Sequence, residues 1–380
     1  MKQEFDVVVV GQGIVGLAHA FAAARAGKSV AVVDRHARAL GASIRNFGFV
    51  TVTGQARGEM WSLAMRARDV WASVAPQAAI DVLQTGLNVF AHRNEAVDVL
   101  AEFMQTEMGE QCELVTSKSW RAANPHLDVA PFELALRSPH ELRIEAREAI
   151  PKLRSWLEQA HGVLFLEPAD VIGCETGNVE TTRGGLRAET VFVCPGDDLN
   201  GLFPDVMTRH LVTRCKLHML RLAAPGVRLP APVMADLSLV RYEGYSHLPS
   251  AAALRSRLEA ERAELLAAGI HLIAVQSADG SLVVGDTHEY GDAPTPFQPA
   301  DKDALMLEAL RETLPGLPTT PVERWIGVYA SSPSAPWFSE EVRPGVHMTV
   351  VTCGAGMSTA FAIAERVVSR ALNVTLSEAA

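Results

Sequence analysis

The fold is decided by residues 7–16, which read Val7-Val8-Val9-Val10-Gly11-Gln12-Gly13-Ile14-Val15-Gly16. Four β-branched residues in a row predict a strand that is buried on both faces of a parallel sheet. The alanine-rich stretch 17–26 predicts a helix, and Gly27 is placed to end it. Residues 30–33 predict the next strand, with Asp34 at its end. This order of strand, glycine turn, helix and strand is typical of a dinucleotide-binding unit.

The glycine turn and the acid that follows it have separate tasks in such a unit. Gly11 allows the tight turn, Gly13 lets the backbone approach a pyrophosphate, and Gly16 lets helix and strand pack closely. The N-terminus of the helix offers free N–H groups to the phosphates. Asp34 can accept hydrogen bonds from ribose hydroxyls, which disfavours NADP and leaves FAD and NAD open. The residues expected at the dinucleotide are Gly11, Gly13, Ile14, Val15, Gly16, Asp34 and Arg35.

Composition limits the class of protein. The chain has 380 residues, 48% of them hydrophobic and 21% charged, which predicts a soluble globular protein of two domains or one large one. A net charge of −10 argues against a nucleic-acid binder but says little about small anionic ligands. Five widely spaced cysteines without a CxxC pattern predict free thiols, no disulfide framework and no metal site, as in the cytoplasm. We expect neither a signal peptide nor a membrane span.

Two kinds of predicted secondary-structure pattern alternate along the chain. Helices are predicted at 57–71 and 148–160, strands at 163–166, 170–174, 179–182 and 191–194, and a last strand at 346–351 before a turn and a helix. Between about 214 and 320, strand-like pieces at 217–222, 237–242, 271–275 and 282–284 surround a charged helix at 253–267. This predicts an α/β protein, with a Rossmann-like dinucleotide domain (1–82, 143–213, 320–380) and an inserted α+β substrate domain with a mixed antiparallel sheet (83–142, 214–319).

Four further motifs resemble those of the D-amino-acid oxidase-type FAD oxidoreductases, which include glycine oxidase and sarcosine oxidase. The motifs are the loop 41–48 (Gly-Ala-Ser-Ile-Arg-Asn-Phe-Gly), the strand and turn 191–196, the Trp-Ile-Gly-Val-Tyr segment 325–329, and the turn 354–359 (Gly-Ala-Gly-Met-Ser-Thr). In the family the first runs along the flavin, and the last aims a helix N-terminus at the flavin pyrimidine, where it stabilises negative charge. The resemblance implies FAD contacts at Ser43, Arg45, Asn46, Gly48, Val171, Pro195, Gly196, Gly354, Gly356, Met357, Ser358 and Thr359.

The resemblance also implies a reaction. A hydride leaves the carbon next to an amine nitrogen for flavin N5, the imine is hydrolysed, and the electrons pass to oxygen or to another acceptor. Sarcosine oxidase-like members attach their flavin through a cysteine where this chain has Gly327, so we expect non-covalent FAD. Some of them place a lysine over the flavin to promote reaction with oxygen. The corresponding strand 282–285 has none, which argues against a fast oxidase.

One departure concerns the substrate. Relatives that oxidise free amino acids usually clamp the carboxylate with an arginine at the position of Tyr329. Either the clamp has moved to another arginine, or the substrate is not a plain α-amino acid. Residues 43–55 and 280–290 resemble a subgroup associated with bacterial breakdown of 2-aminoethylphosphonate and its N-methyl derivatives, and a phosphonate requires other basic donors. Candidates are Arg45, Arg143, Arg214, Lys216 and Arg241.

The expected catalytic residues are Arg45, Tyr329, Tyr245 and His288, although a lone histidine such as His288 is more often structural. Tyr242, Tyr245 and His247 lie where the family places aromatic residues over the substrate, whereas Trp337 and Phe338 are expected only to pack. The leading interpretation is an FAD-dependent oxidation of a small amine that carries an acidic group. An N-methyl or D-amino acid oxidase, a flavoprotein subunit that passes electrons to a partner, and a hydroxy-acid dehydrogenase stay open, as does a homo-oligomer.

Overall fold

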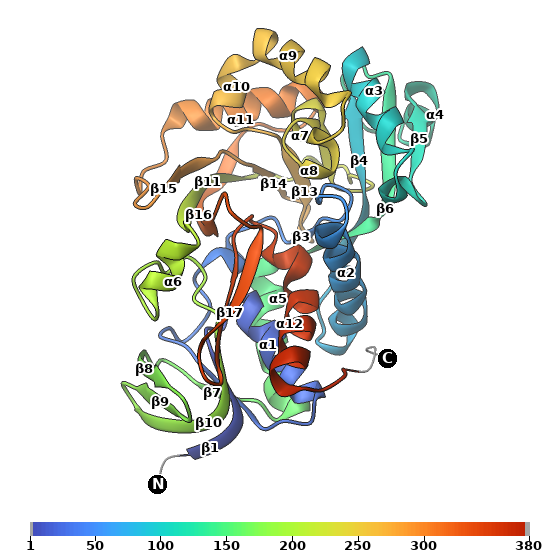
Figure 1. Cartoon of the computed structure of the whole chain (residues 1–380). Coiled ribbons are helices and arrows are strands. Elements are labelled where there is room, and N and C mark those ends of the chain that lie inside the picture. The colour runs from blue at the N-terminus through green and yellow to red at the C-terminus, as the bar shows by residue number, and fades with distance from the viewer. Residues whose placement is uncertain (1–2, 377–380) are drawn as a thin grey trace.

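Two sheets, one above the other, organise the chain (Figure 1). The computed structural model describes residues 3–376. In the view of Figure 1 the first sheet and both ends of the chain lie in the lower half, and the second sheet lies in the upper half. The chain passes between the halves several times, so each half is built from separated segments, and the zone where the halves meet is lined by both.

The first sheet has the order β17-β18-β10-β1-β2-β7. Its central strands run parallel, and β1 pairs with β10 on one side and with β2 on the other. Val7, Val8 and Val9 are fully buried, because Val7 and Val9 pack on one face of the sheet and Val8 packs on the other. The strands of this sheet are β1 (Gln3–Val10), β2 (Val30–Val33), β7 (Leu164–Leu166), β8 (Val171–Glu175), β9 (Asn178–Thr181), β10 (Gly184–Val193), β17 (Trp337–Arg343) and β18 (Val346–Val351).

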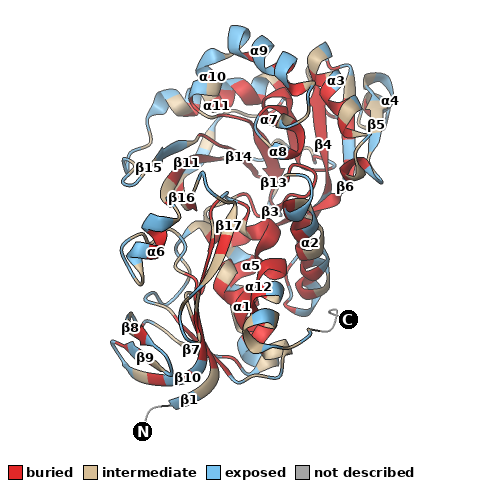
Figure 2. Cartoon of the chain, viewed as in Figure 1, coloured by how far each residue is buried: buried red, intermediate tan, exposed pale blue. Residues whose placement is uncertain are grey.

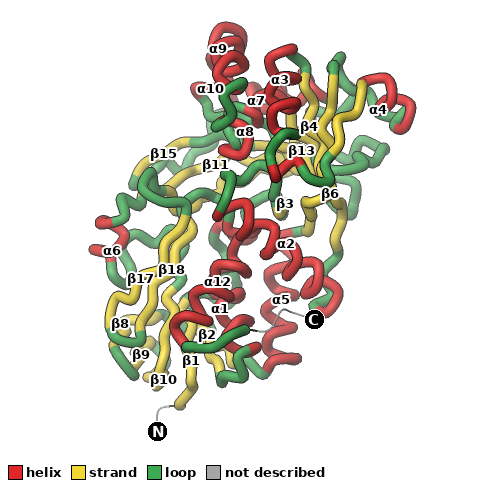
Figure 3. The backbone as a smooth tube through the Cα atoms, turned by 45° about the vertical axis from the view of Figure 1, so that its right-hand side comes forward, coloured by secondary structure: helices red, strands yellow, loops and turns green. Residues whose placement is uncertain are grey.

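Helices cover one face of the first sheet. The tube in Figure 3 shows α1, α5 and α12 on this face, with α2 alongside. Phe21, Trp71 and Phe361 join three of these helices through edge-on ring contacts in one apolar core. The hairpin of β8 and β9 and the short helix α6 pack on the opposite face. The helices of this half are α1 (Ile14–Arg25), α2 (Glu59–Gln77), α5 (Ala146–His161), α6 (Pro204–Arg209) and α12 (Gly356–Leu372), with a 3-10 turn at Ala42–Ile44.

The second sheet has the order β15-β11-β14-β13-β12-β4-β6-β3 and is mostly antiparallel, with one parallel pair between β12 and β4. Its strands are β3 (Phe49–Val50), β4 (Val82–Ala91), β5 (Glu113–Thr116), β6 (Leu134–Ile144), β11 (Thr213–Leu222), β12 (Val233–Ala235), β13 (Ile273–Gln276), β14 (Leu282–Gly285), β15 (Glu289–Gly291) and β16 (Pro321–Ser331). Its helices are α3 (Asn94–Phe103), α4 (Ser117–Ala123), α7 (Asp236–Leu239), α8 (Glu243–Ser246), α9 (Ala251–Glu261), α10 (Ala263–Ala267) and α11 (Ala300–Thr313), with a 3-10 turn at Glu107–Gly109.

Burial follows the layers. Figure 2 shows the strands and the inner faces of the helices as buried, whereas the outer faces of α9 and α10 are exposed. The strand β14 is buried along its whole length, and so is its neighbour β13. Among residues 3–376, no helix is long and apolar enough to cross a membrane.

The predicted fold class is confirmed: a parallel α/β unit is combined with a second unit built on a mixed, largely antiparallel sheet. The domain boundaries stay a prediction, and two strands of the second sheet fall outside the ranges predicted for its domain. β3 and β16 belong to the second sheet, although both fall within ranges predicted for the dinucleotide domain. The strand expected at 237–242 is wrong, because this segment forms α7 and the turn before α8. The single helix expected at 253–267 is divided at Arg262 into α9 and α10.

Candidate functional site

A cavity of about 730 Å³ extends between the two halves of the molecule. This volume lies within the range of small-molecule and cofactor sites. It is lined by the turn after β1 with Asp34, by residues 193–198, by β16 and by the turn before α12. The residues of the second sheet that line it form the part that we call its substrate end. The cavity therefore joins the predicted dinucleotide turn to the sheet expected to carry the substrate.

The turn after β1 leaves no room for side chains. Gly11 has a φ of +104°, and a Cβ atom there would lie 2.5 Å from the carbonyl oxygen of Cys194. A Cβ atom on Gly16 would lie 1.8 Å from the carbonyl oxygen of Gly11. Both glycines are therefore required by the turn and by the close contact of α1 with it, as the sequence predicts.

Asp34 is fixed by the backbone at the end of the cavity. One of its carboxylate oxygens accepts a hydrogen bond from the N–H of Gln12, at 2.8 Å, and the other accepts from the N–H of His36, also at 2.8 Å. The side-chain amide of Gln12 donates to the carbonyl of His36 at 2.7 Å and closes the same loop. A carboxylate held in this way has a fixed position from which it can accept bonds from ribose hydroxyls.

Two helices begin at the cavity. The N-terminal residues of α1 and α12 line it, and neither helix has a side-chain cap on its own N-terminus. Ser43, from the loop after β2, accepts a hydrogen bond from the N–H of Ile14 at 2.9 Å. The two helix N-termini give the cavity the N–H groups and the positive dipole ends that suit phosphates and an electron-rich ring.

Most of the residues predicted to contact the cofactor line this cavity. These are Gly11, Gly13, Ile14, Val15, Gly16, Asp34, Arg35, Ser43, Arg45, Asn46, Val171, Pro195, Gly196, Gly354, Gly356, Met357 and Ser358. Gly48 and Thr359 do not line it. Gly48 lies in a turn with a φ of +63°, and its N–H donates to the side chain of Asn46 at 2.6 Å. Thr359 is fully buried, and its hydroxyl donates to the carbonyl of Ala355 at 2.9 Å.

The predicted aromatic residues separate into two groups. Tyr329, on β16, and Tyr242, beside α8, line the cavity. A Cβ atom on Gly354 would lie 3.0 Å from the ring of Tyr329, so this ring lies against the turn before α12. Tyr245 is fully buried away from the cavity, and its hydroxyl donates to Thr53 at 3.0 Å. His247 is exposed and does not line the cavity.

Tyr245 therefore has a structural position, in contact with Phe103 in the core of the second unit. The contacts of Trp337 and Phe338 agree with a packing role. Phe338 is stacked on His210 at a centroid distance of 3.8 Å, and Trp337 packs at the edge of the core of the first unit.

Of the five basic candidates, three are occupied elsewhere. Lys216 is buried and is bound by Glu289 at 2.7 Å and by two carbonyl oxygens. Arg143 is buried beside Glu145, and Arg214 is bound to Asp197. Only Arg45 and Arg241 line the cavity.

Arg241 lies at the substrate end of the cavity, beside Tyr290. Its guanidinium donates to the hydroxyl of Tyr290 at 2.6 Å and has no carboxylate within ion-pair distance among residues 3–376. Burial alone would lower the pKa of Arg241, but the neighbouring Tyr290, Tyr329 and Asp286 raise it above the ordinary value. Arg241 is therefore a cation at the substrate end of the cavity that has no carboxylate partner among residues 3–376.

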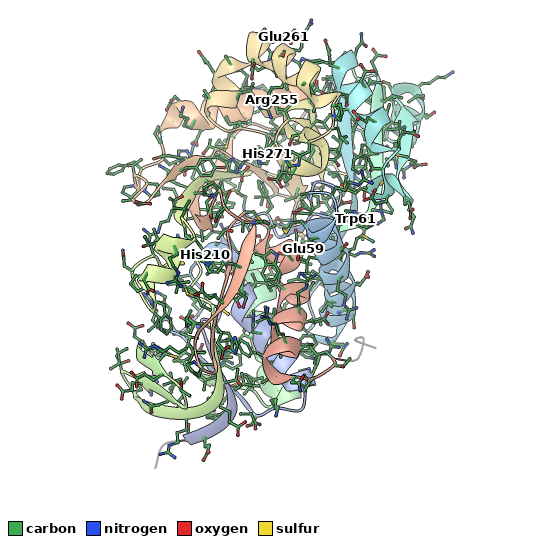
Figure 4. The ribbon with its side chains drawn as sticks, viewed as in Figure 1. Glu59, Trp61, His210, Arg255, Glu261 and His271 are labelled. Carbon is green, nitrogen blue, oxygen red and sulfur yellow. The ribbon has the colours of Figure 1, made fainter. Side chains whose placement is uncertain are left out.

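A cluster of three side chains at the same end was not predicted as a group. His271 precedes β13, and Asp286 and His288 follow β14. Nε2 of His271 lies 2.9 Å from a carboxylate oxygen of Asp286, and the ring centroids of His271 and His288 are 5.1 Å apart. All three residues line the cavity. Figure 4 shows His271 below Arg255 and above His210, in the zone where the two halves meet.

The antiparallel pairing of β13 with β14 brings this cluster together. Ile273 pairs with Gly285, so residues just before β13 and just after β14 lie at the same edge. Only His288 of the three was expected to act in the site. A hairpin over the turn at Asp279 and Gly280 was the sequence signal that could have found His271 and Asp286.

The charges of the cluster are set by its neighbours. Burial alone would raise the pKa of Asp286, but the two neighbouring histidines and Arg241 lower it, so the carboxylate stays ionised. Burial lowers the pKa of His288 to about 3, and Arg241 and His271 act in the same direction. Ligand-type atoms of the three residues lie within 4.8 Å of one another, a spacing suited to a cation. We assign no metal to this cluster, because the charge of Arg241 already acts on its one carboxylate.

Comparison with known proteins identifies the family. The family model described as DAO, FAD dependent oxidoreductase, matches residues 6–370. The chain belongs to this family. It is therefore an FAD-dependent oxidoreductase with FAD as its cofactor. No curated protein is matched.

Solved structures of similar fold cover almost the whole chain. Glycine oxidase from Geobacillus kaustophilus is 18% identical with a TM-score of 0.78, and the match covers 99% of each chain. L-proline dehydrogenase from P. horikoshii is 17% identical with a TM-score of 0.77, over 97% of this chain and 93% of that one. L-α-glycerophosphate oxidase from Mycoplasma pneumoniae, with FAD bound, is 16% identical with a TM-score of 0.72, over 99% and 96%. At this identity the likeness shows the fold alone.

The geometry of the cavity fits FAD independently of these comparisons. The turn at Gly11 and Gly16 leaves the backbone free to approach a pyrophosphate, and Asp34 is fixed where a ribose would lie. The N-termini of α1 and α12 face the same space. Gly327 lines the cavity, and a Cβ atom there would lie 2.9 Å from the carbonyl oxygen of Arg45, so this position has little space for a larger side chain.

Proposed function

We propose that this chain oxidises a small primary or secondary amine that carries an acidic group, and that the substrate is an aminoalkylphosphonate such as 2-aminoethylphosphonate or its N-methyl form. The observation that carries the proposal is Arg241, a cation at the substrate end of the cavity that has Tyr290 and no carboxylate as its partner. A guanidinium in this situation can take an anionic group of a ligand without first giving up an ion pair.

A second cation supports an acidic substrate. Arg45 lines the same cavity, and its side chain has no hydrogen-bond or ion-pair partner within residues 3–376, whereas its carbonyl accepts from Trp325 at 3.1 Å. Arg45 comes from the loop after β2, and Arg241 comes from the second unit. The two cations therefore approach the cavity from different halves of the molecule, which suits a ligand held between the halves.

Tyr329 occupies the position where amino-acid-oxidising relatives carry their carboxylate arginine. Burial raises the pKa of its phenol well above the ordinary value, so the side chain is neutral. It lies against the turn at Gly354 and can donate one hydrogen bond, but it adds no charge. The charge that binds the acidic group must then come from Arg241 and Arg45, with Tyr329 and Tyr242 closing the cavity around the substrate.

FAD, when bound, supplies the hydride acceptor for the carbon next to the amine nitrogen. The chain itself has to orient that carbon, exclude water and keep the nitrogen unprotonated. We assign orientation to Arg241 and the enclosing tyrosines, and the chemistry at the nitrogen to His288.

A second candidate function is supported by the same arginine. One guanidinium matches a carboxylate as a pair of parallel hydrogen bonds, so Arg241 is also a relocated carboxylate clamp for an N-methyl or D-amino acid. The solved structures of similar fold include a glycine oxidase. The two functions differ in the acidic group of the substrate, so a matched pair of substrates separates them.

The test compares kcat/KM for 2-aminoethylphosphonate and β-alanine, which differ only in the acidic group, with sarcosine and D-alanine as further substrates. We expect a preference for the phosphonate of about tenfold or more, because a dianion gains more from two guanidinium groups. Equal rates, or a preference for β-alanine or for an amino acid, would favour the carboxylate function. The acceptor is tested in parallel, by comparing reoxidation of the reduced protein by oxygen and by an artificial electron acceptor.

The same assay tests whether Arg241 binds the acidic group of the substrate. Arg241→Gln removes a charged donor, and such bonds contribute about 1.5–3 kcal/mol, so kcat/KM should fall about 10- to 150-fold. Arg257→Gln is the matched control, since Arg257 lies on the exposed face of α9 in an ion pair with Glu261. An Arg241→Gln protein that keeps the wild-type kcat/KM for every amine would show that the acidic group binds elsewhere.

A further inference from the structure

The pair of Asp286 and His271 has no role in holding the substrate's acidic group, although both residues are almost completely buried at the substrate end of the cavity. The exposed fractions of their side chains are 6% and 4%. A buried carboxylate is costly unless its neighbours compensate its charge, and here the contact with His271 and the charge of Arg241 do so. Such an arrangement beside a substrate cavity needs a functional explanation.

His288 has a defined tautomer. Its Nδ1 lies 2.8 Å from the carbonyl oxygen of Gly269, which can only accept a hydrogen bond, so Nδ1 carries the proton. In the neutral ring Nε2 then carries the lone pair. Nε2 has no hydrogen-bond partner among the residues that the structure describes, and His288 lines the cavity. His288 is thus a neutral proton acceptor with one nitrogen in use and one available.

Asp286 and His271 are placed to respond when His288 gains a proton. Ligand-type atoms of all three side chains lie within 4.8 Å of one another, so a charge on the imidazole of His288 forms beside a carboxylate. Nε2 of His271 lies 2.9 Å from one oxygen of that carboxylate, and the ring of Tyr242 packs edge-on against the ring of His271 at a centroid distance of 5.1 Å. His271 is therefore a positioning residue for Asp286.

We propose that Nε2 of His288 takes the proton from the ammonium group of the substrate, and that the acidic group of the same substrate makes this transfer favourable by neutralising Arg241. The N–H bond of the ammonium breaks and its electron pair stays on nitrogen, while the proton forms a new N–H bond on His288. The products are a neutral amine and an imidazolium whose charge is balanced by Asp286. This step rests on the proposed function, because it needs a substrate with both groups.

The electrostatics support the second half of the proposal. Burial contributes most to the lowered pKa of His288, Asp286 raises this pKa, and Arg241 lowers it further. Tyr290 bridges Arg241 and His288, with its hydroxyl on Arg241 and its ring 6.2 Å from the ring of His288. An anion bound to Arg241 cancels that influence and leaves Asp286 as the main charge acting on His288. The titratable and charged side chains that line the cavity around His288 are Arg241, Tyr242, Glu243, His271, Asp286, Tyr290 and Tyr329.

The arrangement links recognition to chemistry. When an amine without an acidic group binds, the charge of Arg241 is not neutralised and His288 remains a poor base. Such an amine stays protonated and is not oxidised. An acidic amine activates its own proton acceptor by binding. Specificity for the acidic group should then be visible in the rate of oxidation of the bound substrate, and not only in its affinity.

The first experiment measures the rate of flavin reduction by saturating substrate in the holoenzyme between pH 6 and pH 10. His288→Gln and Asp286→Asn should lose about 10²–10⁴-fold near pH 7, which is the usual contribution of a general base. The loss should shrink by about tenfold per pH unit toward the pKa of a free amine, about 10, because the neutral amine then binds directly from solution. His271→Gln should show a smaller loss with the same pH dependence.

The matched control is His247→Gln, since His247 is exposed outside the cavity. If His288→Gln lowered the rate equally at every pH, His288 would have a structural role and the proposal would be overturned. A His288→Gln protein with the wild-type rate at pH 7 would also overturn the proposal. If no acidic amine reduces the flavin of the wild-type protein, the proposed function itself fails. The two failures are therefore distinguishable.

A second experiment measures the coupling between Arg241 and His288 without turnover. The imidazole of His288 is titrated by NMR in the holoenzyme, with His288→Gln to assign its signal, in the absence and in the presence of ethylphosphonate, which has the acidic group and no amine. We expect ethylphosphonate to raise the pKa of His288 by at least one unit, and Arg241→Gln to remove most of that shift. An unchanged pKa with bound ethylphosphonate would contradict the coupling, whereas a failure of ethylphosphonate to bind would count against the acidic-group site.

Discussion

The contact between Asp34 and the turn before α1 gives a prediction about cofactor affinity. The substitution Asp34→Asn replaces a carboxylate that accepts the N–H groups of Gln12 and His36, each at 2.8 Å. An amide has one acceptor oxygen, so one of these N–H groups would face an NH₂ group instead. The ribose hydroxyl also loses a charged acceptor. Each such loss is worth about 1–3 kcal/mol, and the two are not additive.

A combined loss of about 2–3 kcal/mol corresponds to an FAD affinity that is about 30- to 150-fold weaker. The assay is a titration of the apoprotein with FAD, followed by quenching of flavin fluorescence, with the Tm of the apoprotein as a check on folding. Asp6→Asn is the matched control, because Asp6 also accepts a backbone N–H, that of Ser29 at 2.7 Å, but lies outside the cavity. An Asp34→Asn protein with the FAD affinity of the wild type and a normal Tm would refute the placement of the ribose at Asp34.

Three further predictions test the core, the ion pairs and the cofactor linkage. Tyr245→Phe removes the hydroxyl that donates to Thr53 at 3.0 Å, so the free energy of unfolding in urea should fall by about 0.5–1.5 kcal/mol. The rate of flavin reduction by substrate should stay unchanged, and a large fall in that rate would show that Tyr245 acts in the site. Burial alone would raise the pKa of Glu365, but Arg66 and Arg25 lower it. The stability that the ionised Glu365 contributes is therefore present above the unfolded pKa of about 4.5 and is lost as the pH falls below that value. Glu365→Gln should lower the free energy of unfolding in urea at pH 7 and progressively less below pH 4.5, and an equal deficit at every pH would contradict this. The resemblance implies that Gly327 stands where covalently flavinylated relatives carry a cysteine. Acid precipitation should therefore release all the flavin into solution, and a fluorescent protein band in a denaturing gel would contradict a non-covalent cofactor.

Much of the cofactor half could be predicted from the sequence, because its signals are local. A run of four valines, a glycine turn and a helix are read from neighbouring residues, and the structure places them as expected. The resemblance implies a cofactor contact at Gly48, but this residue does not line the cavity; its φ of +63° and its hydrogen bond to Asn46 place it in a turn.

The substrate end was harder to predict because it depends on contacts between distant segments. Leu237 and Leu239 flank Ser238 in the alternation of a strand, but the segment forms α7 and a turn that places Arg241 and Tyr242 at the cavity. His271 and Asp286 lie 15 positions apart and meet only through the register of β13 and β14. Lys216 was an equal candidate to Arg241 by sequence, and only the fold shows that Glu289 already binds it.

The measurement that tests the central claim most directly is the visible spectrum of the purified holoprotein under anaerobic conditions, recorded as single amines are added. We predict that the flavin band bleaches rapidly with 2-aminoethylphosphonate or its N-methyl form, and far more slowly with glycine, sarcosine or D-alanine. Bleaching by sarcosine or D-alanine alone would contradict the proposed substrate and show that Arg241 or another arginine holds a carboxylate. A spectrum that no amine changes would contradict the oxidation of an acidic amine by this site.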